Sequence, residues 1–313
     1  MGSEAMRVGV IGVGHLGRHH ARILGQLEGA TLVAVVDTQL DRAEQAASAT
    51  GARALTDFRE LLGEVDAVSI AVPTEMHRDI AMPFLERGTA VLVEKPMART
   101  LDEADELVAA ARASGATLAV GHTERYNPAV HTVLPLVTSP RFIEVHRLGV
   151  FPERSLDIDV VFDLMIHDLD IVLALVRSEV TSIEAVGVPV LTDKFDIANA
   201  RLRFASGCIA NITASRISKD RVRKIRFFQP DAYLSIDYAA QEVEGWRLVR
   251  RDGAKPRIEG GQIPVTKDEP LRRELADFIR AAREKTPPLV DGAAGRKALE
   301  LATRIAEKME SAL

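Results

Sequence analysis

A glycine-rich turn that follows a short apolar run constrains the fold of this chain more than any other feature. Residues 7–11 form the run, and Gly12, Gly14 and Gly17 follow it in the spacing G-x-G-x-x-G. In a strand–turn–helix, the first glycine permits the tight turn, the second lets a pyrophosphate approach the backbone, and the third allows close packing of helix on strand. The helix N-terminus then offers its positive dipole end to the phosphates. The sequence therefore predicts a dinucleotide-binding unit.

The first third of the chain alternates short apolar runs with amphipathic segments of helical period. This alternation is typical of repeated βαβ units and of a parallel sheet. We expect strands over residues 7–11, 31–36, 67–72, 90–93 and 117–120, with helices over residues 15–27, 39–49, 75–87 and 101–113. These segments predict a doubly wound parallel sheet, a Rossmann domain, over residues 1–121.

The pattern changes after Gly121. Asn127 followed by Pro128 is a typical helix start, because the amide side chain caps the helix and proline suits its first position. A very apolar helix is predicted over residues 160–176. Two more helices are expected near the C-terminus, over residues 271–285 and 295–311.

Between these helices, from residue 181 onward, apolar and polar residues alternate with period two. The alternation is clearest in residues 198–204, and Ser206 and Gly207 separate that run from the next one. Such a pattern indicates an antiparallel hairpin with one solvated face. The fold class predicted for the whole chain is therefore α/β, with an α+β second domain over residues 122–313 that contains a large, mainly antiparallel open sheet.

Composition excludes several classes of function. Lys and Arg number 40 against 45 Asp and Glu, a net charge of -5 that disfavours nucleic acid or an anionic membrane as partner. No apolar run approaches the roughly 20 residues of a membrane span, and the N-terminus has no signal-peptide pattern, so we expect a cytoplasmic protein. The single cysteine, Cys208, excludes intrachain disulfides and cysteine-rich metal sites.

Asp37, at the end of the second predicted strand, indicates the cofactor. It follows Gly17 by about twenty residues, where a carboxylate accepts hydrogen bonds from the ribose hydroxyls of NAD. The same carboxylate repels the additional phosphate of NADP, and no arginine follows it directly. NAD is therefore favoured, although Arg42 leaves the use of NADP open.

Two further segments close predicted parallel strands, at the sheet edge where open α/β sheets bind ligands. Residues 71–74 are expected to run past the cofactor. Glu94, Lys95 and Pro96 end the next strand. Lys95 at that position can donate a hydrogen bond to a substrate hydroxyl and stabilise the developing alkoxide. From this segment alone, a surface lysine paired with Glu94 is an equally good interpretation.

The apolar helix over residues 160–176 also carries acidic residues and a histidine. At 3.6 residues per turn, Asp163, His167 and Asp170 fall on one stripe. Burying these groups unpaired would be costly, so we expect the stripe to face a polar cavity or the cofactor. His167 is then a candidate general acid/base, and Asp163 would orient the substrate or the imidazole. A buried structural histidine and an aspartate that serves the helix dipole are the alternatives.

Metal-assisted chemistry is a competing interpretation of the same residues. Asp163 and His167 have the spacing of two metal ligands, as do His15 and His19, but the sequence offers neither pair a clear further ligand. Motifs for a serine nucleophile elbow and for a phosphate-binding P-loop are absent from the sequence. We therefore predict no metal.

Together these segments resemble the glucose-fructose oxidoreductase/inositol dehydrogenase (Gfo/Idh/MocA) family. The resemblance rests on the glycine turn, residues 71–74, residues 94–96, the spacing of Asp163 and His167, and residues 288–298. It implies a Rossmann domain joined to an α+β domain whose open sheet packs against another subunit, and so a homodimer or homotetramer. The implied chemistry is NAD(P)-linked oxidation of a sugar or cyclitol hydroxyl without a metal.

The resemblance also implies residue roles. It makes Lys95 and His167 the catalytic pair, assisted by Asp163. The cofactor contacts that we expect are Gly12, Gly14, His15, Leu16, Gly17, Asp37, Ala71, Pro73, Thr74, His77, Glu94 and Lys95. The expected substrate contacts are Lys95, Arg125, Tyr126, Asp163, His167 and Arg216. One departure is that residues 157–162 replace a glycine-rich run found in many family members.

Four segments resemble most the bacterial branch of the family that oxidises UDP-N-acetylglucosamine at its 3-hydroxyl. They are residues 122–128, 163–170, 228–230 and 237–238. The alternatives are a dehydrogenase of a free sugar or cyclitol and an NAD-binding sensor without turnover. Because a sensor has no need of a proton-transfer pair, the presence of both Lys95 and His167 favours the enzyme.

A basic run in the second domain bears on the substrate. Residues 215–226 hold six cations against Asp220, namely Arg216, Lys219, Arg221, Arg223, Lys224 and Arg226. Arginines bind diphosphates through paired hydrogen bonds, whereas a solvated strand edge is the alternative explanation. We expect a nucleotide-diphosphate sugar, with UDP-N-acetylglucosamine the first choice and Arg216 and Arg125 as candidate phosphate contacts.

Overall fold

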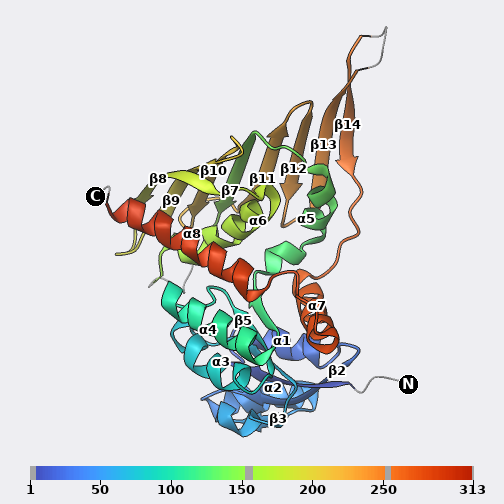
Figure 1. The fold of residues 1–313 in the computed structure, drawn as a ribbon, viewed down its shortest axis with the longest axis vertical. Coiled ribbons are helices and arrows are strands. Elements are labelled where there is room, and N and C mark those ends of the chain that lie inside the picture. Colours follow the sequence, from blue (N-terminus) through green and yellow to red (C-terminus); the bar gives the residue numbers. More distant parts are fainter. Residues whose placement is uncertain (1–4, 152–157, 251–254, 312–313) are drawn as a thin grey trace. The chain divides into compact units, whose positions relative to one another are not determined.

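A computed structural model describes residues 5–151, 158–250 and 255–311 and divides the chain into two compact units (Figure 1). The first unit is Met1–Thr123 with Leu271–Lys297, and the second is Glu124–Pro270 with Ala298–Leu313. Some residues of the two predicted domains, and residue 157 of the family departure, lie outside the described residues.

The first unit contains a six-stranded, fully parallel sheet in the order β3-β2-β1-β4-β5-β6. Its strands are β1 (Met6–Ile11), β2 (Ala30–Val36), β3 (Arg53–Leu55), β4 (Ala67–Ile70), β5 (Ala90–Glu94) and β6 (Leu118–Gly121). The strand order reverses between β1 and β4, which is the point where doubly wound sheets bind ligands. The predicted Rossmann sheet is therefore confirmed, and β3 is the strand that the sequence pattern missed.

Helices cover this sheet. They are α1 (Gly17–Leu24), α2 (Leu40–Thr50), α3 (His77–Leu85), α4 (Leu101–Ser114) and α7 (Pro270–Glu284). The apolar core combines residues of β1 and α1 with Leu275, Phe278 and Ile279 of α7. This packing explains why residues 271–297 belong to the first compact unit, whereas the prediction assigned everything after residue 121 to the second domain.

The second unit contains an eight-stranded sheet in the order β14-β13-β12-β11-β7-β10-β9-β8. Its strands are β7 (Phe142–Leu148), β8 (Val180–Val188), β9 (Ile197–Phe204), β10 (Ile209–Ser215), β11 (Val222–Gln229), β12 (Ala232–Asp237), β13 (Glu242–Val249) and β14 (Arg257–Ile263). Every pairing among them is antiparallel except that of β7 with β10. The predicted mainly antiparallel sheet and the β9–β10 hairpin are confirmed.

One face of this sheet is packed against helices, and Figure 1 shows α5 (Pro128–Val133) and α6 (Ile166–Val176) in front of it. In β9, the residues at alternate positions from Ala198 to Phe204 are buried. They share a core with α6 and with the C-terminal part of α8 (Gly292–Glu310). As predicted, Asn127 caps α5, its Oδ1 accepting a hydrogen bond from the Ala129 amide at 3.0 Å.

The predicted apolar helix over residues 160–176 is divided in two. Val161–Met165 form a π-helical turn, and the α-helix α6 begins at Ile166. A π turn holds more residues than an α turn and is frequent at functional sites. Among the described residues, no helix is both long enough and apolar enough to cross a membrane.

Candidate active site

The glycine turn after β1 is held by close contacts that only glycine allows. Gly12 has a positive φ of 82°, and a Cβ there would lie 2.6 Å from the carbonyl oxygen of Ala71. A Cβ at Gly17 would lie 1.7 Å from the carbonyl oxygen of Gly12. A Cβ at Gly14, by contrast, would meet no atom of the described residues within 4 Å. The turn is therefore packed at Gly12 and Gly17 and open at Gly14.

Asp37 follows β2 and joins it to this turn. Its Oδ2 accepts a hydrogen bond from the Val13 amide at 3.1 Å, and its Oδ1 accepts one from the Gln39 amide at 3.0 Å. The carboxylate is therefore fixed beside the turn and remains half-buried. Leu16 and His15 are exposed at the start of α1, which has no side-chain cap. These features fit a dinucleotide, with its ribose at Asp37 and its phosphates at the helix start.

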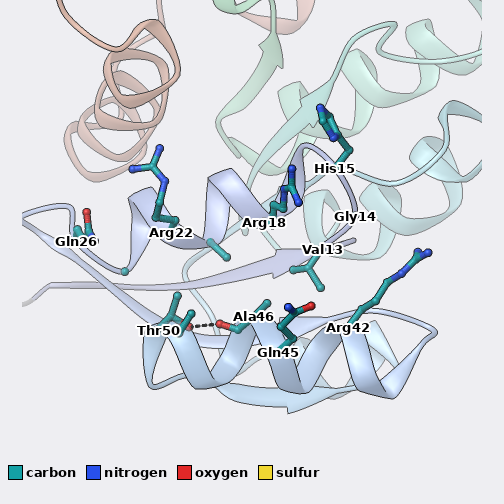
Figure 2. Close-up of a pocket in the computed structure, with 13 residues that line it drawn as sticks. Val13, Gly14, His15, Arg18, Arg22, Gln26, Arg42, Gln45, Ala46 and Thr50 are labelled. Atoms are coloured by element: carbon teal, nitrogen blue, oxygen red, sulfur yellow. Dashed lines mark hydrogen bonds between the residues drawn. The ribbon is translucent and has the colours of Figure 1, made fainter. Parts of the chain in front are cut away.

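A pocket of about 580 Å³ begins at this turn and extends along the groove between α1 and α2. Figure 2 shows Arg18 and Arg22 of α1 and Arg42 of α2 around it. Ala21, Gly25, Ala46 and Ala49 are among the small residues that line it. The pocket touches the predicted cofactor turn at Val13, Gly14 and His15, but most of it lies along the two helices.

His77 connects the two loops that were predicted to pass the cofactor. Its Nε2 lies 2.9 Å from the carbonyl oxygen of Val72, and its Nδ1 lies 3.0 Å from that of Pro96. Burial lowers the pKa of His77, and these carbonyls oppose the shift. A neutral ring carries one N–H, so it donates to one carbonyl at a time. This placement suggests that His77 supports the loops from inside, whereas the prediction made it a cofactor contact.

Lys95 follows the last residue of β5 at the same sheet edge. Its amide donates a hydrogen bond to Oε2 of Glu94 at 3.2 Å, and its side chain is half-buried. Ala71, Pro73 and Thr74 follow β4, the strand next to β5. The structure therefore brings the glycine turn, Asp37, residues 71–74 and residues 94–95 to the carboxyl edge of one sheet.

Asp163 and His167 lie in the second unit, in the π turn and the first turn of α6. Both side chains are half-buried, whereas their neighbours Met165 and Ile166 are buried. The expectation that Asp170 shares their open stripe is wrong, because Asp170 is only 2% exposed. Because His167 and Asp170 keep regular α-helical spacing in α6, the difference comes from Arg125, a partner of Asp170 that residue spacing does not show.

A buried charge cluster lies beside His167. The guanidinium of Arg147 on β7 donates hydrogen bonds to both carboxylate oxygens of Asp168, at 2.6 and 3.0 Å, and one to Glu124 at 3.2 Å. Burial opposes the charge of Arg147, but the carboxylates of Asp168 and Glu124 outweigh it and raise the pKa of the guanidinium. Burial also raises the pKa of Asp168, and Arg147 opposes that shift. The paired hydrogen bonds need an ionised carboxylate, so we take the pair as charged.

Arg125, a predicted substrate contact, is buried in the second unit beside Asp170. Its Nη1 donates to the carbonyl oxygen of Asp170 at 3.3 Å and lies 3.5 Å from Oδ1 of the same residue. Burial raises the pKa of Asp170 to about 7, although Arg125 opposes the shift. Tyr126 is buried as well. These placements favour structural roles for Arg125 and Tyr126.

Arg216, the first candidate for a phosphate contact, is 1% exposed. Its Nε donates to Oδ1 of Asp196 at 2.8 Å, and its Nη1 donates to the carbonyl oxygen of Ile158 at 2.7 Å. Burial alone would raise the pKa of Asp196, but hydrogen bonds from backbone amides and from Arg216 lower it well below its usual range. Arg216 therefore neutralises a buried carboxylate, and this placement favours a structural role over a phosphate contact.

The other five cations of the basic run differ in their partners, and Arg223, which is exposed, lies 3.9 Å from Glu124. Lys224 lies 3.3 Å from Asp237, and Arg226 lies 2.7 Å from Glu144, so these cations are paired across neighbouring strands. Lys219 and Arg221 are exposed in the turn between β10 and β11. No ion pair of these two residues is found among the described residues.

Several residues with polar contacts in the two units were not predicted from the sequence. They are Glu124, Arg147, Asp196 and His20, whose Nδ1 lies 2.7 Å from the hydroxyl oxygen of Ser69. His20 lies on α1 four residues before the buried Leu24, so helical spacing could have marked it as a buried histidine. Arg147 lies on the same buried face of β7 as Ile143 and Val145, at every second position, and an arginine in such an apolar series is a similar signal. Their partners lie far along the chain, so spacing alone could not have identified them.

The whole chain is similar to known oxidoreductases. A family profile described as an oxidoreductase family with an NAD-binding Rossmann fold, GFO/IDH/MocA, matches residues 6–122. A second profile, described as the GFO/IDH/MocA C-terminal domain, matches residues 149–230. UDP-N-acetylglucosamine 3-dehydrogenase of Acidithiobacillus ferrooxidans is 38% identical over 312 residues, with 98% of each chain covered.

Solved structures give the same result. The structure of UDP-N-acetylglucosamine 3-dehydrogenase GnnA from Acidithiobacillus ferrooxidans has a TM-score of 0.92 at 37% identity, again with 98% of each chain covered. In sequence alone, the scyllo-inositol 2-dehydrogenase (NAD(+)) of Bacillus subtilis is 30% identical over 241 residues, with 68% of each chain covered. Levoglucosan dehydrogenase in complex with NADH and levoglucosan has a TM-score of 0.86 at 19% identity and 98% coverage of each chain, which shows the shared fold.

The raised pKa of Asp170 predicts a pH-dependent stability. In the unfolded chain an aspartate has a pKa of about 3.9. Because the folded pKa is higher, the carboxyl stabilises the fold fully at low pH, and this contribution is lost as the pH rises through about 7. Replacement Asp170→Asn removes the titration. From pH 5 to pH 7, the free energy of unfolding of the wild type should fall by roughly 2 kcal/mol relative to that of the variant.

Urea unfolding of both proteins at several pH values measures this difference. The control is Asp193→Asn, because Asp193 is exposed in the same unit. Parallel pH curves for the wild type and the Asp170 variant would contradict the burial of an ionisable carboxyl at this position.

Proposed function

Because the chain belongs to the GFO/IDH/MocA oxidoreductase family, we propose that it is an NAD-dependent dehydrogenase of a nucleotide sugar. UDP-N-acetylglucosamine is the proposed substrate, and its 3-hydroxyl is the group oxidised. The observation that carries this proposal is the match with UDP-N-acetylglucosamine 3-dehydrogenase over 98% of both chains in sequence and in fold.

The reaction converts a secondary alcohol into a ketone, with the carbon losing a hydride and the oxygen losing a proton. NAD bound at the glycine turn supplies the hydride acceptor. We assign the proton to the half-buried His167, because imidazole is the side chain best suited to proton transfer near neutral pH. Lys95 stabilises the negative charge that develops on the substrate oxygen. Asp163, one turn before His167, orients the imidazole or the substrate.

Contacts to the diphosphate are assigned to the turn between β10 and β11. Arg216 neutralises Asp196, and Lys224 and Arg226 face acidic residues on adjacent strands. Lys219 and Arg221 are exposed cations of the same basic run, and Arg223, which is also exposed, lies 3.9 Å from Glu124. Guanidinium and ammonium groups both bind phosphates strongly. We therefore move the predicted phosphate contact from Arg216 to Lys219 and Arg221.

A cyclitol dehydrogenase is the second candidate function. The match with the scyllo-inositol 2-dehydrogenase of Bacillus subtilis over 68% of the chain favours it. Incubation of the protein and NAD with UDP-N-acetylglucosamine, free sugars and inositols, followed by NADH absorbance, separates the two. The first proposal requires turnover of the UDP-sugar, whereas turnover of inositols alone would support the second.

Homo-oligomer formation is part of the proposal. The face of the second sheet that is opposite the helices carries alternating positions of intermediate exposure, including Phe142 and Tyr233, and Phe228 on the same sheet is 38% exposed. Aromatic residues on an open sheet face favour association with a second copy of the chain. A homodimer or homotetramer should be visible by light scattering at micromolar concentration. The expected cytoplasmic location stays a prediction.

The catalytic assignment predicts the effect of two substitutions. Lys95→Ala and His167→Ala should each lower kcat by about 10²-fold to 10⁴-fold, the usual contribution of a positioned acid or base. The Kd for NAD should remain within a small factor of the wild-type value, because neither residue is assigned to the adenosine end. Steady-state kinetics with UDP-N-acetylglucosamine and calorimetry with NAD measure the two quantities.

Matched controls are Lys297→Ala, an exposed lysine of the first unit, and His146→Ala, a half-buried histidine of the second unit. These variants should keep wild-type turnover. If Lys95→Ala or His167→Ala also keeps it, the role assigned to that residue is wrong.

Asp37 predicts the choice of cofactor. The wild type should bind NAD more tightly than NADP, because the Asp37 carboxylate repels the 2′-phosphate. Asp37→Ala should weaken NAD binding and reduce the discrimination between the cofactors, with Arg42 and Arg18 near the turn available to the added phosphate. Calorimetric titration of both cofactors measures this, and Asp41→Ala on the exposed start of α2 is the control. Tighter binding of NADP by the wild type would refute the assignment.

The exposed cations of the β10–β11 turn predict binding of a diphosphate. The NAD-loaded protein should bind UDP, and the double variant Lys219→Ala/Arg221→Ala should bind it about tenfold or more weakly through loss of charge-assisted hydrogen bonds. The control removes two exposed cations of the same unit, Arg304 and Lys308 on α8, by the same substitution. Equal loss of UDP affinity in both double variants would contradict the assignment, because it would show that the overall charge of the protein causes the loss and not a contact of Lys219 and Arg221.

A further inference from the structure

A buried histidine contacts the carboxylate that precedes the proposed catalytic lysine. His20 on α1 has no exposed surface, and Glu94 at the end of β5 is 6% exposed. The Nε2 atom of His20 lies 3.1 Å from Oε1 of Glu94. Because Nε2 makes no aligned hydrogen bond with a described residue, the contact is electrostatic.

The other ring nitrogen of His20 is held on the opposite side. Its Nδ1 lies 2.7 Å from the hydroxyl oxygen of Ser69 on β4. A serine hydroxyl can donate to an unprotonated Nδ1, which places the ring proton on Nε2. A proton on Nε2 is the arrangement that attracts the Glu94 carboxylate. Ser69 thus orients His20 toward Glu94.

The second oxygen of the carboxylate is bound to the backbone of Lys95. Oε2 of Glu94 accepts the hydrogen bond from the Lys95 amide at 3.2 Å. One carboxylate therefore contacts His20 through one oxygen and the lysine backbone through the other. A charged group at this depth needs such partners, because an unpaired buried carboxylate is strongly destabilising.

Gly121 on the neighbouring strand β6 provides the space for this carboxylate. A Cβ at Gly121 would lie 2.9 Å from the carboxyl carbon of Glu94 and 2.9 Å from each of its oxygens. Real Cβ atoms do not approach so closely, so only glycine at this position leaves the carboxylate where it is. The position of Glu94 is thus defined from three sides, by His20, by the Lys95 amide and by β6.

We propose that His20 is a positioning residue for Lys95, which it holds in place through the Glu94 carboxylate. The proposal rests on the proposed function, because it takes Lys95 as a catalytic residue. His20 belongs to the helix that begins at the glycine turn, so the element that binds the cofactor phosphates also fixes the loop of the catalytic lysine. A displacement of about 1 Å in such a group can reduce turnover about 10²-fold.

Three substitutions of His20 separate its two contacts. In His20→Gln, the side-chain amide nitrogen reaches the place of Nε2 and keeps an N–H group beside the Glu94 carboxylate. In His20→Asn, the shorter amide reaches only the place of Nδ1 and keeps the contact with Ser69. His20→Ala loses both. Because Gln and Asn leave a polar group in the same buried space, their comparison removes most of the general effect of the substitution.

A fourth variant acts on the carboxylate without changing His20 or Lys95. In Gly121→Ala, the added methyl group displaces the Glu94 carboxylate. We expect His20→Asn, His20→Ala and Gly121→Ala to lower kcat about tenfold to 10²-fold, with His20→Gln close to the wild type. The KM for NAD should change less than about twofold in all four, because the glycine turn and Asp37, to which the phosphates and the ribose are assigned, are not substituted. The measurements are steady-state kinetics and thermal unfolding of each purified variant.

The outcomes distinguish this inference from the function on which it rests. If Lys95→Ala keeps wild-type turnover, the proposed function fails. If Lys95→Ala is inactive while folded His20→Asn keeps wild-type kcat, His20 does not position the lysine and the inference is overturned. Equal kcat losses in His20→Gln and His20→Asn, in proportion to their loss of stability, would also overturn it, because they would indicate a purely structural role. If the alanine variant does not fold, the Gln/Asn comparison and Gly121→Ala still decide the question.

Discussion

The close approach of backbone at the glycine turn is the constraint on which the first unit depends. Gly17 packs against the carbonyl oxygen of Gly12, and Gly12 packs against that of Ala71, at distances that leave no room for a side chain. This contact fixes where α1 begins relative to β1 and β4. It therefore also fixes His20, one turn into α1, beside Ser69 and Glu94. A turn known for binding phosphates thus determines where the proposed catalytic lysine lies.

The second unit buries charged groups next to the half-buried His167. Arg147 pairs with Asp168, the residue that follows His167, and Arg216 pairs with Asp196. Breaking such a pair by removing one partner typically costs about 3–5 kcal/mol. The Arg147 pair holds the start of α6 against the sheet while Asp163 and His167 keep partly exposed side chains. Both arginines are therefore better explained as partners of buried carboxylates than as contacts of the substrate.

Local rules predicted much of this from the sequence. Parallel strands bring their carboxyl ends to one edge, so the order of the strands along the chain was enough to place residues 12–17, 37, 71–74 and 94–95 together. The role of Arg216 could not be predicted, because its burial depends on Asp196, twenty residues earlier in the chain. The burial of Asp170 depends on Arg125, 45 residues earlier in the chain, and the π turn at Val161–Met165 is not visible in residue spacing. Long-range pairing and irregular helix geometry are the two kinds of information that the pattern did not contain.

The central claim is that this chain removes a hydride from carbon 3 of a UDP-sugar. Turnover of UDP-N-acetylglucosamine that carries deuterium at carbon 3, followed by mass spectrometry of the reduced cofactor, tests it most directly. The account predicts NADH that contains the deuterium, together with a slower chemical step than for the unlabelled substrate. NADH without deuterium would place the oxidation at another carbon, and absence of any reduced cofactor would contradict the proposed reaction as a whole.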